Sequence, residues 1–447
     1  MRYFLAIIGG GPAGYTAAEK ASKAGKDVVL FEQNAVGGTC LNVGCIPTKS
    51  LLYGAKQYYN ATHAQKYGVT AENVQFDFAA MQKRKTIVVR KLVAGIKQRL
   101  NNEHCTVVNG VAKVLDSIRQ TWRIECNGET YEAENLMICT GSTNFVPPIP
   151  GIKDNPAIWD STDALAATEL PKSIIIVGGG VIGMEFATLY HELGVPVTVI
   201  EALPTILPNL DQEVVGVLAE KYKKAGINIL TETKVEEIDG GKVTANGVEY
   251  EAEKILVSVG RRANLSGLEA LEGLETERGA IKIDEFCRTN LPNVYACGDV
   301  TGKIMLAHVA SRQAEVAVTK LLNDQIAHDQ KVNYLAIPSV VYTNPEIASV
   351  GVTESQAEEM SIPVEVRKLP MTFSGRFMAE NEGETGLCKM IIDSRSNTII
   401  GVHCIGNPCS EFIAAASCAV RNGYTLDDFR QVVFPHPTVS EILHEIV

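Results

Sequence analysis

The chain has 447 residues, of which 46% are apolar and 21% are charged, and its formal net charge is −11. This length suggests about three globular domains, and the negative charge argues against nucleic acid or an anionic membrane surface as the main partner. No apolar run approaches the roughly 20 residues of a membrane-spanning helix, and the run Phe4–Ile8 is too short for a signal-peptide core, so we expect a cytoplasmic protein. The 11 cysteines are too thinly spread for a disulfide scaffold.

The chain begins with a pattern typical of dinucleotide binding. The apolar run Leu5–Ile8 predicts a short strand, and it leads into the loop Gly9-Gly10-Gly11-Pro12-Ala13-Gly14 and a helical pattern. A second strand, Val28–Glu32, ends in an acid that lies 23 residues after Gly9. A lone glycine loop is weak evidence, but this strand–loop–helix–strand–acid order predicts a pyrophosphate at the helix N-terminus and a ribose at Glu32.

Two cysteines, Cys40 and Cys45, follow with four residues between them. Pro47 and the run Lys49–Leu52 indicate a helix that starts nearby, and a helix N-terminus lowers the pKa of a thiol. A pair this close can form a disulfide and reopen it. The alternatives are two buried thiols or half of a zinc site, but no two further ligands at matching spacing are evident. We therefore predict a redox pair and no metal.

A second copy of the dinucleotide pattern follows the proline-rich stretch Pro147–Gly151. The apolar run Ile174–Val177 leads into a loop with Gly178, Gly180 and Gly183, and the strand Val197–Glu201 again ends in an acid 23 residues after the first glycine. Two such units predict two bound dinucleotides.

Further glycines and acids in the sequence suggest where the domains end. Gly260 closes the second unit, and Asn293–Asp299 is typical of a strand that ends at a glycine and an acid. Beyond about Tyr334, alternating strands and an amphipathic helix predict an α+β segment. The predicted strands are Ser339–Tyr342, Leu387–Ile392 and Ile399–Ile405, and the predicted helix is Glu411–Asn422. We therefore expect an α/β protein divided at residues 1–144, 145–263, 264–334 and 335–447.

His436 is a candidate base near the C-terminus. Pro435 and Pro437 flank it and restrict its backbone, and Glu441 is close enough to orient a ring nitrogen if the chain turns there. Deprotonating a thiol needs a group that titrates near neutrality, and histidine supplies one.

These motifs, with Leu306-Ala307-His308, Tyr342–Glu346 and His436–Glu441, resemble the class I pyridine nucleotide–disulfide oxidoreductases from Ile7 to about Glu445, and within that class the dihydrolipoamide dehydrogenases. The resemblance implies two Rossmann-like domains, for FAD (1–144 and 264–334) and for NAD (145–263), and a C-terminal α+β dimerisation domain (335–447). It also implies a homodimer that oxidises dihydrolipoyl groups on lipoyl-domain proteins, namely the acyltransferases of 2-oxoacid dehydrogenase complexes or the glycine cleavage H protein.

The resemblance further implies the role of each site residue. Cys40 would exchange with the substrate, Cys45 would face the flavin, and His436 with Glu441 would act as base from the opposite subunit. Lys49 would lie near the flavin, paired with Glu185. The implied FAD-binding residues are Gly9, Gly11, Pro12, Ala13, Gly14, Glu32, Gly38, Thr39, Lys49, Thr140, Gly141, Asp299 and Ala307, and the implied NAD-binding residues are Gly178, Gly180, Gly183, Glu201 and Gly260. Taken alone, Asp299 could be a turn acid, and Glu185 could favour the helix dipole.

NAD is expected rather than NADP, because Glu201 would repel a 2′-phosphate and Thr198–Glu213 contains no Lys or Arg.

Two other functions stay open: a disulfide reductase of the same fold that acts on a small disulfide, and a non-catalytic subunit of a large complex. The segment Phe373–Phe377 departs from the usual lipoamide pattern, and Cys297 is interpreted as a small packing residue.

Overall fold

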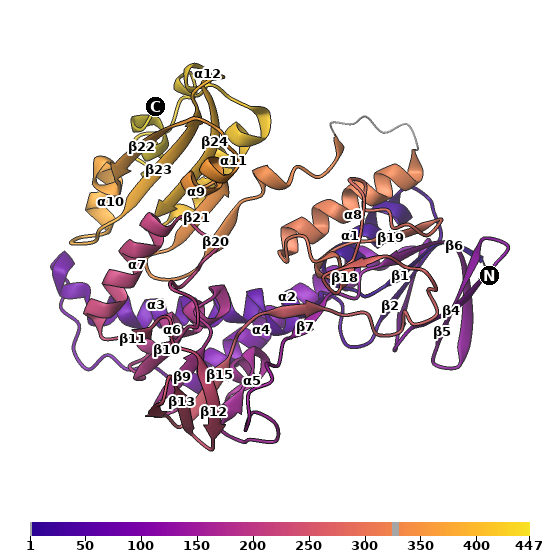
Figure 1. Cartoon of the computed structure of the whole chain (residues 1–447), viewed down its shortest axis with the longest axis horizontal. Coiled ribbons are helices and arrows are strands. Elements are labelled where there is room, and N and C mark those ends of the chain that lie inside the picture. The colour runs from indigo at the N-terminus through magenta and orange to yellow at the C-terminus, as the bar shows by residue number, and fades with distance from the viewer. Residues whose placement is uncertain (1, 324–329) are drawn as a thin grey trace. The chain divides into compact units, whose positions relative to one another are not determined.

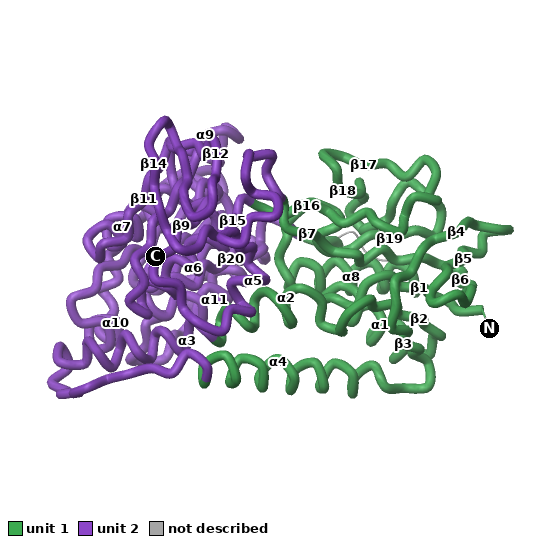
Figure 2. The backbone as a smooth tube through the Cα atoms, turned by 90° about the horizontal axis from the view of Figure 1, so that it is seen from below, with its two compact units in different colours: residues 1–50, 80–145, 260–332 green, residues 51–79, 146–259, 333–447 purple. Residues whose placement is uncertain are grey.

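The computed structural model describes residues 2–323 and 330–447, so residues 324–329 of the predicted segment 264–334 lie outside the described residues. The chain divides into two compact units, coloured separately in Figure 2. Unit 1 comprises residues 1–50, 80–145 and 260–332, and unit 2 comprises residues 51–79, 146–259 and 333–447. The second glycine-loop pattern and the terminal α+β segment therefore belong to the same unit.

Unit 1 is built on a seven-stranded sheet (Figure 1). Strands β3, β2, β1 and β6 lie side by side in parallel, β19 also pairs with β6, and β5 and β4 continue the sheet antiparallel. Every residue of β2 is buried, as expected for a parallel strand that is covered on both faces. The elements are β1 (Arg2–Ile8), α1 (Pro12–Lys23), β2 (Val28–Glu32), α2 (Gly38–Val43), α4 (Phe78–Leu100), β3 (Cys105–Asn109), β4 (Lys113–Ile118), β5 (Thr121–Cys126), β6 (Glu129–Ile138), β7 (Ser142–Asn144), β16 (Arg261–Ala263), β17 (Thr276–Glu277), β18 (Ala280–Ile281), β19 (Val294–Ala296), the 3₁₀ turn η2 (Asp299–Thr301) and α8 (Ala307–Leu322).

The first part of unit 2 repeats this design with a parallel sheet in the order β11-β10-β9-β15-β8, and a three-stranded antiparallel sheet, β12-β13-β14, accompanies it. The elements are η1 (Ala64–Tyr67), β8 (Ile158–Trp159), α5 (Ser161–Ala166), β9 (Ile174–Val177), α6 (Val181–Glu192), β10 (Val197–Ile200), α7 (Gln212–Ala225), β11 (Asn228–Leu230), β12 (Val235–Asp239), β13 (Lys242–Ala245), β14 (Val248–Glu251) and β15 (Lys254–Val257). Helix α3 (Cys45–Thr62) begins in unit 1 and ends in unit 2.

The C-terminal part of unit 2 is a five-stranded antiparallel sheet in the order β20-β21-β24-β23-β22. Helix α11 packs on β21 and β24, and its apolar face closes a core with the buried side chains of β23. The elements are η4 (Tyr334–Ala336), β20 (Ser339–Val341), β21 (Ile347–Gly351), α9 (Glu354–Glu359), β22 (Val364–Pro370), η5 (Met371–Phe373), α10 (Gly375–Glu380), β23 (Leu387–Asp393), β24 (Thr398–Ile405), α11 (Cys409–Asn422), α12 (Leu426–Arg430), η6 (Val439–Glu441) and α13 (Ile442–Glu445).

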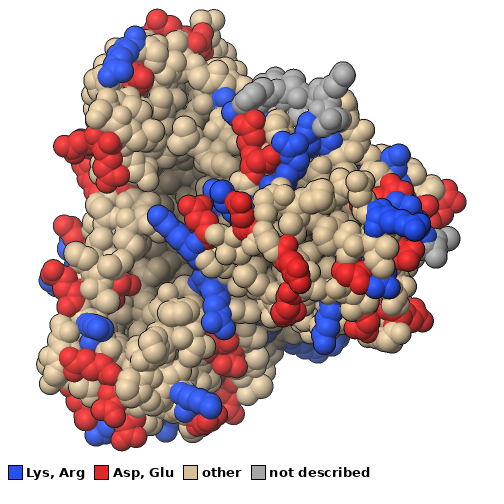
Figure 3. Space-filling view, turned by 45° about the vertical axis from the view of Figure 1, so that its right-hand side comes forward, with Lys and Arg blue, Asp and Glu red and all other residues tan. Residues whose placement is uncertain are grey.

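This architecture confirms the predicted fold class, two doubly wound α/β parts and a terminal α+β part. The atypical segment Phe373–Phe377 forms the end of η5 and the start of α10. In the described part of the chain, no helix is both long and apolar enough to cross a membrane. On the face shown in Figure 3, acidic and basic side chains are interspersed.

A buried ion cluster joins the two parts of unit 2. The ammonium group of Lys389, on β23, lies 2.9 Å from a carboxylate oxygen of Asp211, and both side chains are only 3% exposed. Asp211 also caps α7 by accepting from two backbone N–H groups. The more exposed acids Glu213 and Glu354 lie 3.1 and 2.7 Å from the same ammonium. Because both charges of the central pair are buried, each depends on its partner.

Replacing Lys389 with Ala should destabilise the protein by about 3–5 kcal/mol, since it leaves the buried Asp211 carboxylate without its cation. The matched control is Lys368→Ala, because Lys368 pairs with Glu213 at the surface and such pairs contribute only about 0–1 kcal/mol. Urea midpoints of the two FAD-loaded variants give the comparison. Equal midpoints would show that the buried cluster does not stabilise this unit.

Candidate active site

In the first glycine loop, the fold itself requires glycine at positions 9 and 14 but not at position 11. A Cβ atom on Gly9, whose φ is +106°, would lie 2.2 Å from the carbonyl oxygen of Cys139, and one on Gly14 would lie 1.8 Å from that of Gly9. A Cβ on Gly11, which caps α1, would meet nothing closer than 3.8 Å. The fold alone would accept a side chain at position 11. A glycine there is therefore explained by a ligand, such as FAD, that approaches the backbone closely.

The second loop has the same division. A Cβ on Gly178 would lie 2.7 Å from the carbonyl oxygen of Ser258, and one on Gly183 would lie 2.1 Å from that of Gly178, whereas one on Gly180 would meet nothing within 4 Å. Gly180 caps α6, whose first N–H groups carry the positive end of the helix dipole. These residues therefore fit a dinucleotide pyrophosphate.

Glu32 and Glu201, predicted as ribose acceptors, also hold their own loops. Glu32 accepts from the backbone N–H of Gly10 at 2.7 Å and of Asn34 at 2.8 Å. Glu201 accepts from Gly179 at 2.6 Å and from Leu203 at 2.8 Å. A carboxylate offers about four lone-pair positions, so each retains capacity for ribose hydroxyls. This second role of the acids was not predicted.

The two cysteines lie on consecutive helices. Cys40 belongs to α2 and Cys45 is the first residue of α3, as the sequence predicted for a helix start near the second thiol. Both side chains are half-buried. The expected low pKa is wrong for Cys40: its hydrogen bond with Cys45 and its burial raise its pKa, and the ammonium of Lys49 only partly opposes them. The two sulfurs therefore lie within hydrogen-bond reach of each other, which favours the protonated thiol at Cys40.

Residues without redox chemistry fix the cysteine segment. The amide nitrogen of Asn42 lies 3.0–3.3 Å from the carbonyl oxygens of Ala35, Val36 and Gly38. Thr48 donates its hydroxyl to the carbonyl oxygen of Gly44 at 2.7 Å. No motif marked Asn42 beforehand, and its role follows from the turn that it closes.

The segment is also attached directly to the first glycine loop. Gly37 donates its N–H to the carbonyl oxygen of Gly10 at 2.8 Å, and a Cβ on Gly38 would lie 2.6 Å from Cα of Gly11. The predicted FAD-binding residues Pro12 and Ala13 form the start of α1, and Thr39 lies in α2 beside Gly38. The structure therefore brings these residues together.

Polar side chains that the sequence did not single out fix the predicted FAD-binding residue Asp299 and its neighbour Gly298. Ser142 donates its hydroxyl to Asp299 at 2.6 Å, and Arg261 donates to that hydroxyl and to the carbonyl oxygen of Ser142, each at 2.8 Å. Asp299 is thus held in place by a hydrogen-bonded chain. The fully buried Gln313 accepts from the N–H of Gly298 at 2.6 Å. Ser142 and Arg261 were missed because their partners lie more than 100 positions away in the sequence, and Gln313 was missed because no motif includes it.

The remaining predicted residues of unit 1 lie at the ends of elements. Thr140 donates its hydroxyl to the carbonyl oxygen of Asn264 at 2.6 Å, and Gly141 has a φ of +72° with open space at its Cβ position. Ala307 begins α8. Gly260 has a φ of +121°, also with open space beside it. Cys297 is fully buried, as its interpretation as a packing residue requires.

Glu185 is buried on α6 at 4% exposure, and its carboxylate accepts from the backbone N–H of Tyr342 at 3.1 Å. The half-buried Lys49 lies on α3 in unit 1, whereas Glu185 lies in unit 2. The pairing of these two residues stays a prediction.

His436 and Glu441 form the predicted pair. His436 Nδ1 lies 2.8 Å from one carboxylate oxygen of Glu441, and the other oxygen accepts from the N–H of Thr438 at 2.7 Å. The Thr438 N–H and the imidazole lower the pKa of Glu441, so it is ionised near neutrality and can orient the ring. The His436 side chain is 81% exposed in the single chain.

Replacing Gly180 with Ala should leave folding and FAD content intact, because the added methyl meets no protein atom within 4 Å. It should weaken NADH binding at least about tenfold, because the methyl takes the space that the pyrophosphate needs. Gly183→Ala is the contrasting variant and should misfold, since its methyl would meet the Gly178 carbonyl oxygen. NADH titration of the purified proteins tests this; unchanged affinity in Gly180→Ala would place the dinucleotide elsewhere.

Comparison with known proteins agrees with this geometry. Residues 3–314 match the pyridine nucleotide-disulphide oxidoreductase family, and residues 337–447 match the dimerisation domain of that family. Dihydrolipoyl dehydrogenase of Geobacillus stearothermophilus is 38% identical, covering 98% of this chain and 94% of the relative, and that of Mycoplasma pneumoniae is 37% identical, covering 100% and 98%. Among solved structures, LpdA of Mycobacterium tuberculosis superposes with a TM-score of 0.91 at 27% identity, covering 99% and 98%. The HOCl-induced flavoprotein disulfide reductase RclA of Escherichia coli superposes with a TM-score of 0.87 at 30% identity, covering 99% of each chain. The chain therefore belongs to the pyridine nucleotide-disulphide oxidoreductase family.

Proposed function

We propose that this enzyme is a dihydrolipoyl dehydrogenase, which oxidises protein-bound dihydrolipoyl groups with NAD⁺. The observation that carries the proposal is the Cys40–Cys45 dithiol at the start of α3, attached to a glycine loop that fits FAD. Relatives named dihydrolipoyl dehydrogenase at 37–38% identity over nearly the full chain support it. The family relationship indicates FAD and NAD(H) as the cofactors.

In this proposal the reaction begins with a proton transfer. His436, oriented by Glu441, takes a proton from one thiol of the substrate, and the resulting thiolate attacks Sγ of Cys40 in the Cys40–Cys45 disulfide. A bond forms between the substrate sulfur and Cys40, and Cys45 leaves as a thiolate. The second substrate sulfur then attacks the first, the bond between the substrate and Cys40 breaks, and Cys40 leaves with the proton of the second thiol, so the substrate becomes the cyclic disulfide and the cysteine pair gains two electrons.

Bound FAD would supply the transfer of these two electrons from the dithiol toward NAD⁺ as a hydride. The residues that would hold FAD are those of the first glycine loop, Glu32 and Asp299, and Lys49 would stand beside the ring. Gly178, Gly180, Gly183, Glu201 and Gly260 would hold NAD⁺. The carboxylate of Glu201, fixed by two backbone N–H groups, cannot turn away from a 2′-phosphate without losing both hydrogen bonds.

The partners follow from the same chemistry. The family's dimerisation domain supports a homodimer. His436 is exposed in the single chain, and Glu441 fixes its orientation. These two features suit a base that completes an active site on the partner chain. We propose lipoyl-domain proteins in the cytoplasm as the substrate carriers. Acyltransferases of 2-oxoacid dehydrogenase complexes and the glycine cleavage H protein present the same dithiol, so each fits this site.

With dihydrolipoamide as substrate, NAD⁺ should be reduced with a kcat/KM at least about a hundredfold above that for NADP⁺, because Glu201 repels a 2′-phosphate. Steady-state assays with both nucleotides test this. Cys45→Ser is the control: it should keep FAD but lose turnover of dihydrolipoamide. Turnover at the wild-type level in that variant, or better turnover of a small disulfide with NADPH, would contradict the proposed function.

Mixing two inactive variants tests the shared site. When Cys45→Ser and His436→Gln are reassembled together in equal amounts, random pairing makes half of the dimers mixed, and each mixed dimer has one site without either defect. Active sites should recover to about a quarter of the wild-type number. No recovery, in a sample where mixed dimers are shown to form, would place His436 and Cys45 of one site on the same chain.

A further inference from the structure

One face of helix α6 is attached to the loop that follows β20. The carboxylate of Glu185 accepts from the N–H of Tyr342 at 3.1 Å, and the carboxylate of Glu192 accepts from the side-chain amide of Asn344 at 2.7 Å. Between them, Thr188 is hydrogen-bonded to Tyr222, whose hydroxyl also accepts from the N–H of Asn344 at 3.3 Å. Residues 185, 188 and 192 share one face of a helix, so α6 is held along its length.

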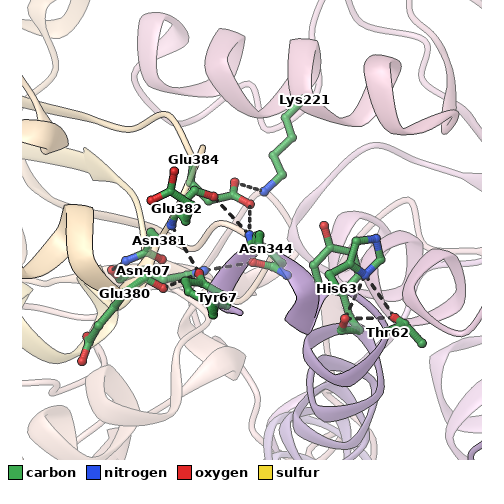
Figure 4. Close-up of polar contacts among 12 residues, drawn as sticks. Thr62, His63, Tyr67, Lys221, Asn344, Glu380, Asn381, Glu382, Glu384 and Asn407 are labelled. Carbon is green, nitrogen blue, oxygen red and sulfur yellow. Dashed lines mark hydrogen bonds and ion pairs between the residues drawn. The ribbon is translucent and has the colours of Figure 1, made fainter. Parts of the chain in front are cut away.

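Asn344 is itself fixed from the other side. Its side-chain oxygen accepts from the side-chain amide of Asn407 at 2.9 Å, and the carbonyl oxygen of Asn407 lies 3.3 Å from the side-chain amide of Asn381 (Figure 4). Because its oxygen is already an acceptor, Asn344 has to present its NH₂ group to Glu192. The C-terminal part of the unit thus determines the orientation of the group that meets α6.

We propose that Glu192 and Asn344 are positioning residues for dinucleotide binding, because they fix the helix whose N-terminus is formed by Gly180. The proposal rests on the proposed use of NAD and adds residues at the opposite end of α6 from the glycine loop. Glu192 is 7% exposed, and no motif of the dinucleotide pattern includes it. Its carboxylate would be costly to leave without a partner.

The surroundings of Glu192 make this contact sensitive to pH. Burial raises the pKa of Glu192 to about 7, although Asn344, Lys56 and Lys221 act in the opposite direction. Lys221 is engaged in an ion pair with Glu384 (Figure 4). Glu384 also pairs with Lys66.

The other titratable groups near Glu192 are Tyr59 on α3, Tyr222 on α7 and the adjacent His191 on α6. Burial raises the pKa of both tyrosines and lowers that of His191. A pKa raised in the folded state means that the burial of Glu192 is favoured while its carboxyl group is protonated and becomes costly as the pH rises through about 7, so the carboxylate then depends more on its hydrogen bond from Asn344. The affinity for the dinucleotide should therefore fall as the pH rises through about 7.

The test uses FAD-loaded protein and equilibrium titration with NADH at pH 6 and pH 8, which needs no lipoyl substrate. In the wild type, the Kd for NADH should rise about threefold between these pH values. Glu192→Gln keeps an oxygen acceptor for Asn344 but cannot ionise, so its Kd should be nearly independent of pH. Glu220→Gln, at an exposed position of α7, is the matched control and should retain the wild-type dependence.

Asn344→Leu should raise the Kd for NADH about fivefold at pH 8, because it removes the partner of a buried carboxylate. Adding Glu192→Gln should recover part of that loss, since the double variant no longer buries a charge. An unchanged Kd in Asn344→Leu, or wild-type pH dependence in Glu192→Gln, overturns the inference. If Asn344→Leu does not fold, the pH dependence of the Kd for NADH in Glu192→Gln, compared with that of the wild type, tests the inference by itself. A wild type that binds no NADH would instead refute the proposed function.

Discussion

A buried carboxylate that accepts the N–H of a loop glycine is the contact on which each nucleotide-binding unit depends. In unit 1, Glu32 holds Gly10, and the carbonyl oxygen of Gly10 in turn accepts from Gly37, at the start of the cysteine segment. The acid at the end of β2 therefore fixes the glycine loop and, through it, the helix that carries Cys40. Losing Glu32 would leave the buried N–H of Gly10 unpaired and release both elements at once.

The repeat of this contact in unit 2 explains why the sequence was informative. A strand, a glycine loop, a helix and a terminal acid lie within about 25 residues, and their spacing is dictated by a βαβ unit, so the pattern is local and survives in the linear sequence. The Cys40–Cys45 pair and the His436–Glu441 pair are local as well. Each was predicted by spacing, and each pair is in contact in the structure.

Contacts between distant segments could not be predicted in the same way. Ser142 meets Arg261 because β7 pairs with β16, and it meets Asp299 of η2 although 157 positions separate them in the sequence. Gln313 meets Gly298 from helix α8. The raised pKa of Cys40 was also beyond the sequence, because it depends on burial and on how the two sulfurs face each other. For α6, the pattern identified the glycine end, whereas the contacts of Glu192 became visible only with the fold.

Differential alkylation measures whether Cys40 and Cys45 form the redox pair. The chain offers an internal alternative, since the buried Cys388 and Cys404 also lie only 3.3 Å apart, on paired strands. Air-oxidised protein is alkylated before and after one equivalent of NADH per chain, and the labelled peptides are identified by mass spectrometry. We predict that Cys40 and Cys45 are protected before reduction and both labelled after it. Labelling that appears at Cys388 and Cys404 instead, or at neither pair, would show that Cys40 and Cys45 do not form the redox pair.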